Sequence, residues 1–125
     1  MEKQTEKKTQ EEVIINGIPY APKNQLAKDV LGQPYVICRT YSAGVFAGYL
    51  EKREGKEVTL KNARRCWMWT GAASLSQLAM SGTSNPKGCK FPETVERVLL
   101  TECIELLDCT EAARKSIAEV PVWKN

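Results

Sequence analysis

The fold is decided by residues 35–60, which read YVICRTYSAGVFAGYLEKREGKEVTL. Apolar residues favour strands at 35–38, 45–50 and 57–60, and small or flexible residues at 42–44 and 53–56 favour turns between them. Two hairpins in series predict a three-stranded antiparallel meander. Residues 65–69, RCWMW, predict a fourth strand. Because side chains alternate along a strand, Cys66 and Met68 would lie on one face and Arg65, Trp67 and Trp69 on the other.

Around this meander the sequence predicts short strands and two helices. Val13–Ile15 favours a strand, residues 22–32 a loop with one helical turn, residues 85–88 a loop, and residues 95–107 one or two strands around Thr101. Ser74 and Gln77 form a capping box for a helix that ends at Gly82. Thr110 caps a last helix over 111–118, and Trp123 is expected to pack onto the sheet.

These signals predict an α+β protein: an antiparallel β-sheet meander with a short middle helix and a C-terminal helix. Residues 1–12 are expected to be a flexible charged tail, and residues 13–125 a single α+β ligand-binding domain. The chain has 125 residues, of which 42% are hydrophobic and 26% charged, as in an ordinary globular protein. No apolar run approaches the ~20 residues that cross a bilayer, and the polar N-terminus predicts a cytosolic protein.

The cysteines and the lack of histidine limit which metal sites, disulfides and catalytic pairs the chain can form. Five cysteines at irregular spacings, without a C-x-x-C pair, predict buried free thiols rather than a zinc or disulfide framework. The chain has no histidine, which excludes a Ser-His or Cys-His catalytic pair within one chain type. The sequence therefore predicts no metal site, no cofactor and no enzymatic activity.

The positive charge is local. The net charge is only +3, but residues 39–70 hold seven cations and three anions, so the rest of the chain is nearly neutral. Such a stretch can attract phosphate groups.

The densest candidate site is residues 61–74, which place arginines and tryptophans just before a predicted helix start. Unpaired N–H groups at a helix start, small residues and arginine side chains all suit a phosphate, and an indole can stack on a purine. The candidate ligand-binding residues are Asn62, Arg64, Arg65, Trp69, Gly71, Ala72, Ser74 and Gln77. Taken singly, each also fits a structural role, as a sheet-edge charge, core aromatic or tight strand-to-helix turn.

A second candidate is the first hairpin turn with its flanking residues. It combines an arginine, hydroxyl groups and aromatic rings, which suit phosphates and ribose, although an ordinary turn explains it as well. Its members are Arg39, Thr40, Tyr41, Ser42, Gly44 and Phe46. Arg114 and Lys115 are a weaker candidate, because a solvated helix face explains them.

Several long strings resemble the phage-encoded Thoeris anti-defence sponges of the first-described type. The resemblance covers roughly residues 35–124, through YVICRTYSAGVFAGYL (35–50), LKNARR (60–65), Trp69, GAASLSQLA (71–79), CKFP (89–92, including Phe91) and VPVWK (120–124). It implies a non-catalytic homo-oligomer built from dimers, up to a hexamer arranged as a trimer of dimers. The contacts it implies are Arg39, Tyr41, Ser42 and Phe46 with Asn62, Arg64 and Arg65.

The resemblance also implies a function. Such a protein sequesters cyclic ADP-ribose isomers made by bacterial TIR-domain proteins, and some members hold cyclic di- or trinucleotides at a second site. This would block anti-phage defence in the host bacterial cytoplasm, with neither a membrane nor a nucleic acid as partner. Three alternatives remain open: a small basic nucleic-acid-binding phage protein that uses residues 39–70, a structural oligomer without a ligand, and a nucleotide-cleaving enzyme.

Overall fold

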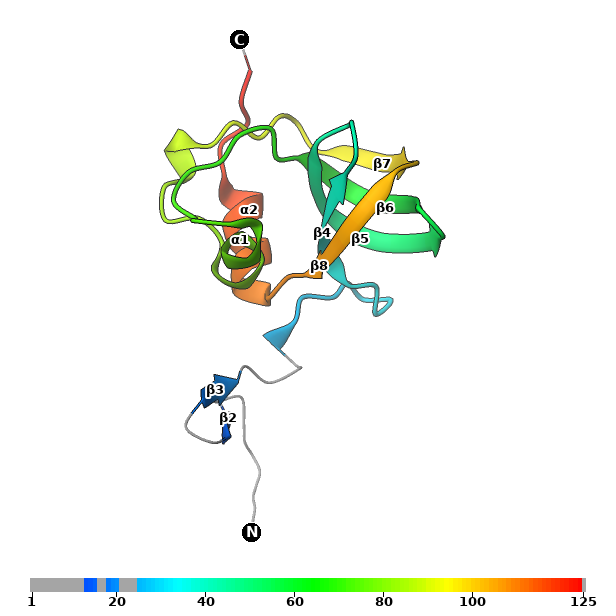
Figure 1. The fold of residues 1–125 in the computed structure, drawn as a ribbon. Coiled ribbons are helices and arrows are strands. Elements are labelled where there is room, and N and C mark those ends of the chain that lie inside the picture. Colours follow the sequence, from blue (N-terminus) through cyan, green and yellow to red (C-terminus); the bar gives the residue numbers. More distant parts are fainter. Residues whose placement is uncertain (1–12, 16–17, 21–24, 125) are drawn as a thin grey trace.

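The computed structural model describes residues 13–15, 18–20 and 25–124, and the expected tail at 1–12 lies outside the described residues. The elements, labelled in Figure 1, are β2 (Val13–Ile15), β3 (Ile18–Tyr20), β4 (Tyr35–Thr40), β5 (Val45–Glu54), β6 (Glu57–Arg65), α1 (Leu75–Ser81), the 3₁₀ turn η2 (Pro86–Gly88), β7 (Val95–Leu100), β8 (Cys103–Asp108) and α2 (Glu111–Glu119). This is an α+β fold, as predicted.

The main sheet has five antiparallel strands in the order β7-β6-β5-β4-β8, and β2 and β3 form a separate two-stranded sheet. In a flat sheet β7 and β8 would lie about 19 Å apart, at four strand spacings. Only Thr101 and Glu102 separate them in the chain, and three Cα–Cα steps reach at most about 11 Å. The sheet must therefore curl until its two edge strands meet at this connection.

Hydrogen bonds hold that corner closed. The Cys103 N–H donates to the Lys56 carbonyl in the β5–β6 turn at 3.0 Å, and the Tyr41 N–H at the end of β4 donates to the Glu102 carbonyl at 2.9 Å. The connection is thus bonded to turns from both halves of the sheet, which fixes the curl.

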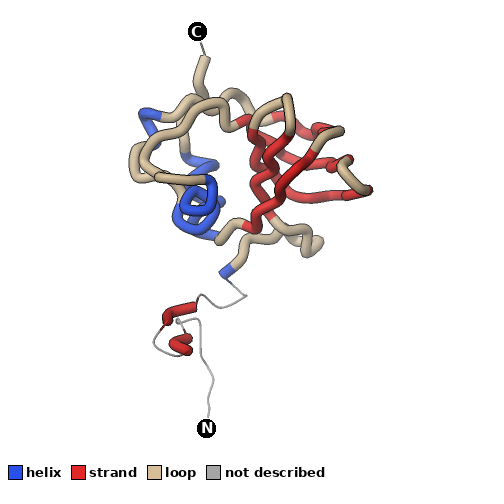
Figure 2. Tube along the Cα trace, viewed as in Figure 1, coloured by secondary structure: helices blue, strands red, loops and turns tan. Residues whose placement is uncertain are grey.

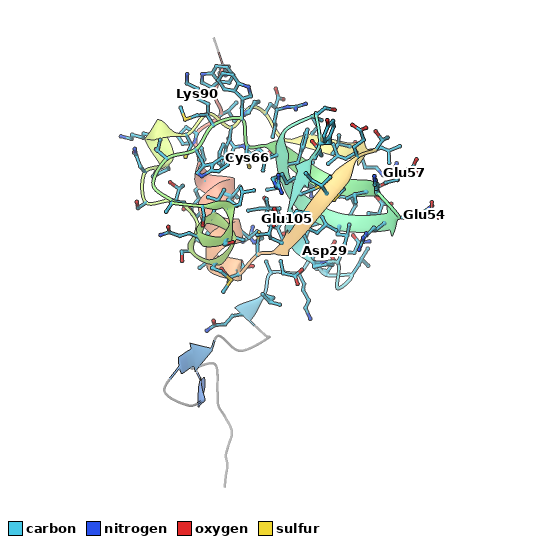
Figure 3. The ribbon with its side chains drawn as sticks, in the orientation of Figure 1. Asp29, Glu54, Glu57, Cys66, Lys90 and Glu105 are labelled. Carbon is cyan, nitrogen blue, oxygen red and sulfur yellow. The ribbon has the colours of Figure 1, made fainter. Side chains whose placement is uncertain are left out.

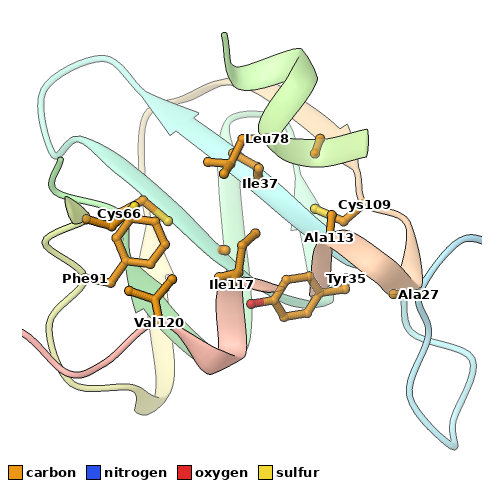
Figure 4. Packing of buried hydrophobic residues seen from close by; sticks show 13 residues of the cluster. Ala27, Tyr35, Ile37, Cys66, Leu78, Phe91, Cys109, Ala113, Ile117 and Val120 are labelled. Atoms are coloured by element: carbon orange, nitrogen blue, oxygen red, sulfur yellow. The ribbon is translucent and has the colours of Figure 1, made fainter. Parts of the chain in front are cut away.

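Curling creates two apolar clusters, one on each face of the sheet. The inner cluster fills the concave side, and its buried members are Val36, Cys38, Phe46, Val58, Leu60, Ala63 and Leu100. The outer cluster joins the convex side to α1 and α2 (Figures 2 and 4) through buried residues that include Tyr35, Ile37, Leu78, Phe91 and Ile117. Because both faces are covered, a side chain on either face can be buried.

Both predicted helix starts are confirmed. The Gln77 N–H donates to Ser74 Oγ at 3.1 Å, and the Ala113 N–H donates to Thr110 Oγ1 at 3.0 Å. Gly82 ends α1 with a φ of 75°, a conformation that glycine adopts readily. Neither helix is long and apolar enough to cross a bilayer, within the part of the chain that the structure describes.

Two sequence expectations are wrong. Residues 66–69 do not form a strand, because β6 has no partner strand beyond Arg65. Phe46–Arg65 is the last residue pair between β5 and β6. The Cys66 N–H donates the final hydrogen bond, to the Val45 carbonyl. Trp123 does not pack on the sheet. Its ring stacks on that of Trp67 outside the sheet, with ring centroids 5.0 Å apart.

Candidate functional site

The predicted turn site between β4 and β5 is held mainly by its own hydrogen bonds. Thr40 is buried, and its hydroxyl donates to the Gly44 carbonyl at 2.7 Å and accepts from the Ala43 N–H at 2.8 Å. Ser42 donates to a Glu102 carboxylate oxygen at 3.0 Å. Gly44 has a φ of 96°, which a larger residue would resist.

The two arginines of this turn region have different surroundings. Arg39 is exposed and pairs with Glu105 at 2.9 Å. Arg65 donates to the Ala43 carbonyl and lies over the buried ring of Phe46, with its guanidinium carbon 4.3 Å from the ring centroid. We call residues 39–46 with Arg65 the turn corner. It exposes Arg39, Tyr41 and Arg65, but Thr40 and Phe46 support the corner from beneath.

Arg64 and Phe91 belong to the core and not to a surface site. Arg64 is 4% exposed, and its guanidinium donates to the carbonyls of Pro92 (3.0 Å), Ile117 (2.8 Å) and Phe91 (3.1 Å). Phe91 is fully buried, with the Arg64 guanidinium carbon 5.6 Å from its ring centroid. Both residues were predicted as ligand contacts, but their burial places them outside the candidate site.

The predicted cluster before α1 is also largely structural. Trp69 and Ala72 are half-buried and pack against the outer cluster. The Gly71 carbonyl accepts from the Ser84 N–H at 3.1 Å, and the Gln77 side-chain oxygen accepts from the Ala73 N–H at 2.7 Å. Ser74 caps α1, and the bonds of Gly71 and Gln77 hold the loops within residues 70–85 together.

The structure instead brings two predicted residues, Asn62 and Arg114, into one groove of about 550 Å³. The groove is open to solvent over most of its extent, so a ligand in it would keep part of its surface exposed. We call it the loop–helix groove. It is lined by Lys28, Asp29, Val30, Tyr49, Asn62, Glu111 and Arg114.

Asn62 reaches the groove because β6 bulges. Between the Ala47–Arg64 and Tyr49–Lys61 pairs, β6 has one residue more than β5, and Asn62 takes a left-handed φ of 49°. Asparagine tolerates this conformation better than most residues, and a bulge re-aims side chains. As a result Asn62 is exposed, whereas its neighbour Ala63 is buried in the inner cluster.

A loop anchored by Asp29 makes one wall of the groove. Asp29 accepts from the N–H groups of Leu31 (2.9 Å) and Gln33 (2.8 Å), and Lys61 pairs with it at 3.2 Å. Desolvation acts to raise the pKa of Asp29, but these hydrogen bonds and the lysine together hold it below its ordinary value. The carboxylate is therefore ionised and fixes the loop beside β6.

The first turn of α2 makes the opposite wall. Arg114 Nε and Nη2 donate to the Glu111 carboxylate at 3.0 and 2.6 Å. These hydrogen bonds raise the pKa of Arg114 and lower that of Glu111. Among the described residues Arg114 Nη1 has no hydrogen-bond partner, so these donors are available to a ligand. Lys115, the next residue, is exposed and does not line the groove.

The groove thus combines an aromatic ring, an amide, two cations and two carboxylates. Tyr49 is half-buried, and its ring meets that of Tyr35 edge-on at 5.0 Å. Lys28, Asp29, Tyr49 and Glu111 were not predicted, because they come from separate segments that only the fold assembles. Within the described residues no group of three or more cysteine, aspartate or glutamate side chains is placed to hold a metal ion.

Comparison with known proteins gives one match. A family model described as "Domain of unknown function (DUF6948)" matches residues 33–117. No curated protein and no solved structure matches the chain significantly. The matched residues include all five strands of the main sheet and most of α2.

Proposed function

The chain belongs to the DUF6948 family, and we propose that it captures small cyclic nucleotides without transforming them. The ligand class is the one that the resemblance implies: cyclic ADP-ribose isomers, with cyclic di- or trinucleotides as further ligands at a second site. Capture would block anti-phage defence in the host bacterial cytoplasm. The observation that carries this proposal is the loop–helix groove, in which Lys28, Arg114, Asn62 and Tyr49 line one volume.

Each of these groups has a counterpart in a nucleotide. The free Nη1 donors of Arg114 and the Lys28 ammonium suit phosphate oxygens, since hydrogen bonds to charged groups are among the strongest. The Asn62 amide can donate to and accept from ribose or base atoms. The Tyr49 ring offers an apolar surface for an adenine.

Capture needs tight equilibrium binding and no turnover. The chain has no histidine, so it contains no Ser-His or Cys-His pair. Burial raises the pKa of the Cys66 and Cys109 thiols to about 12, which makes them poor nucleophiles at neutral pH. Both facts favour binding over cleavage.

The proposal is tested by recovering the ligand. The purified protein is incubated with a lysate that contains an activated TIR-domain protein, freed of unbound small molecules and heat-denatured, and the released compounds are identified by mass spectrometry. Intact cyclic ADP-ribose isomers support capture. A cleaved product would favour an enzyme, and an empty protein would favour the nucleic-acid or structural alternative.

Variants on α2 test the groove itself. Arg114→Gln should weaken ligand affinity about tenfold or more, because a charged hydrogen bond contributes about 1.5–3 kcal/mol. Lys115→Gln is the matched control and should leave the affinity unchanged, since Lys115 does not line the groove. Glu111→Gln should strengthen binding, because the carboxylate no longer competes with phosphate for Arg114. Calorimetric titration with cyclic ADP-ribose isomers measures all three.

The turn corner is the alternative position for the ligand. If Arg39→Ala or Arg65→Ala abolishes capture and Arg114→Gln does not, the ligand binds at the corner. The homo-oligomer that the resemblance implies, a dimer or a trimer of dimers, is part of the proposal and is tested by native mass spectrometry with and without ligand.

A further inference from the structure

Two exposed tryptophans lie at the opposite end of the molecule from the groove, on a layer formed by three loop segments. The Lys90 N–H donates to the Met68 carbonyl at 2.7 Å, and the Trp123 N–H donates to the Phe91 carbonyl at 3.0 Å. These bonds join residues 67–68, 90–91 and 122–123 side by side outside the main sheet. The side chains that project from this layer therefore have fixed backbone positions.

The rings of Trp67 and Trp123 are stacked, with centroids 5.0 Å apart and planes inclined by 7°. Trp67 is 57% exposed and Trp123 39% exposed, so each indole remains accessible to solvent. The Lys90 ammonium lies 5.5 and 5.6 Å from the two ring centroids. Figure 3 shows Lys90 at the end of the molecule where the C-terminal segment emerges, far from Asp29. We call Trp67, Lys90 and Trp123 the tryptophan platform.

Two further lysines, Lys87 and Lys124, lie close in the sequence to the platform residues Lys90 and Trp123. The sequence has no aspartate or glutamate from residue 58 to residue 92. Lys87, Lys90 and Lys124 form no ion pair with any residue that the structure describes. By contrast, Arg39 and Arg114 are each paired with a carboxylate. An anion that approaches the platform thus meets cations that have no competing partner.

We propose that the tryptophan platform binds single-stranded nucleic acid. One base stacks on the open face of Trp67, and the lysines contact the neighbouring phosphates. Aromatic platforms next to lysines are the usual means of binding single strands without sequence preference. The exposure of both rings favours a strand over a free nucleotide, because a strand adds phosphate contacts with the lysines to the base stack and gains affinity from several weak contacts.

This site is independent of the loop–helix groove and of the function proposed for it. Two other occupants are possible in chemical terms. A second copy of the chain could cover the indoles, which would make the platform a dimer contact, and a mononucleotide could stack on Trp67 without a strand. The experiment below separates these three cases.

Binding is measured as the fluorescence anisotropy of a short fluorescein-labelled oligo(dA) over a series of salt concentrations. We expect Trp67→Ala to weaken binding about tenfold, because one base stack contributes about 1–3 kcal/mol. Lys90→Gln should reduce the slope of log affinity against log salt by about 0.7, the value for one phosphate on a single strand. Lys52→Gln, a distant exposed cation, and Arg114→Gln, in the groove, should change neither quantity.

Several results would overturn the proposal. These are no binding of oligo(dA) at low salt, equal binding by the Trp67→Ala protein, or displacement of the oligonucleotide by AMP at the same nucleotide concentration. Self-association that Trp67→Ala abolishes, without oligonucleotide binding, would assign the platform to a dimer contact instead. Because Trp67 is more than half exposed, its replacement should leave the fold intact, and circular dichroism checks this.

Discussion

Replacement of Arg64 by methionine tests whether this arginine holds the fold together or binds a ligand. Its guanidinium donates to three carbonyls, those of Phe91, Pro92 and Ile117, at 2.8–3.1 Å. Ile117 lies in the last turns of α2, where the helix dipole favours a cation. Arg64 thus connects β6 to the 91–92 segment and to the end of α2.

The expected cost follows from these contacts. A hydrogen bond to a charged group contributes about 1.5–3 kcal/mol, and contributions from one network do not add fully. Methionine fills much of the arginine volume but leaves three carbonyls without their donor. We therefore expect Arg64→Met to lower the free energy of unfolding by about 3–5 kcal/mol. For a domain of about 100 residues this lowers Tm by about 12 °C or more.

Urea and thermal unfolding, followed by tryptophan fluorescence and circular dichroism, measure this change. Arg65→Met is the matched control. Arg65 is exposed, donates to one carbonyl and lies over the Phe46 ring, so its loss should cost about 1 kcal/mol or less. If Arg64→Met unfolds within about 1 kcal/mol of the unmodified protein yet loses ligand capture, the structural role is refuted and the sequence prediction of a ligand contact is restored.

Two further predictions concern titrating groups. Of the five thiols, only that of Cys103 is not buried, so Ellman's reagent should label one thiol rapidly in the folded protein and the other four only after unfolding; rapid labelling of Cys66 would contradict its burial. The folded-state pKa values of Asp29 and Glu111 lie below their ordinary values, so their stabilising effect is complete above about pH 5 and is lost as the pH falls through the folded values. The urea midpoint should therefore decrease between pH 5 and pH 3, and Asp29→Asn should make that decrease smaller; an unchanged decrease would remove Asp29 as a cause.

Local signals were sufficient to predict most of the fold from the sequence. The caps at Ser74 and Thr110, the stop at Gly82 and the two strands around Thr101 depend on residues within a few positions of each other. The end of β6 could not be predicted in this way. β6 ends where β5, its partner strand, begins. The alternation of side-chain types over residues 65–69 carries no information about where that partner begins.

The candidate site was harder to predict, because its residues become neighbours only through tertiary structure. Asn62 and Arg114 were identified, but Tyr49 and Asp29 come from segments whose own patterns indicate only a strand and a loop. Because side chains alternate along a strand, the neighbours Arg64 and Arg65 point to opposite faces of β6. This alternation does not tell which of the two arginines is buried, because the curled sheet is covered on both faces.

The cations of the chain differ in how freely they can turn to a ligand. Arg64 is occupied by three carbonyls, so its movement would disrupt the core. Arg114 is shared with Glu111, and a phosphate in the groove must compete with that carboxylate. The Lys90 ammonium lies beside two aromatic rings and forms no ion pair with any described residue, so an anion meets no competing carboxylate partner there. Affinity in the groove should therefore depend on displacing or neutralising Glu111, whereas affinity at the tryptophan platform should depend mainly on salt, and this difference allows the two sites to be studied separately in one protein.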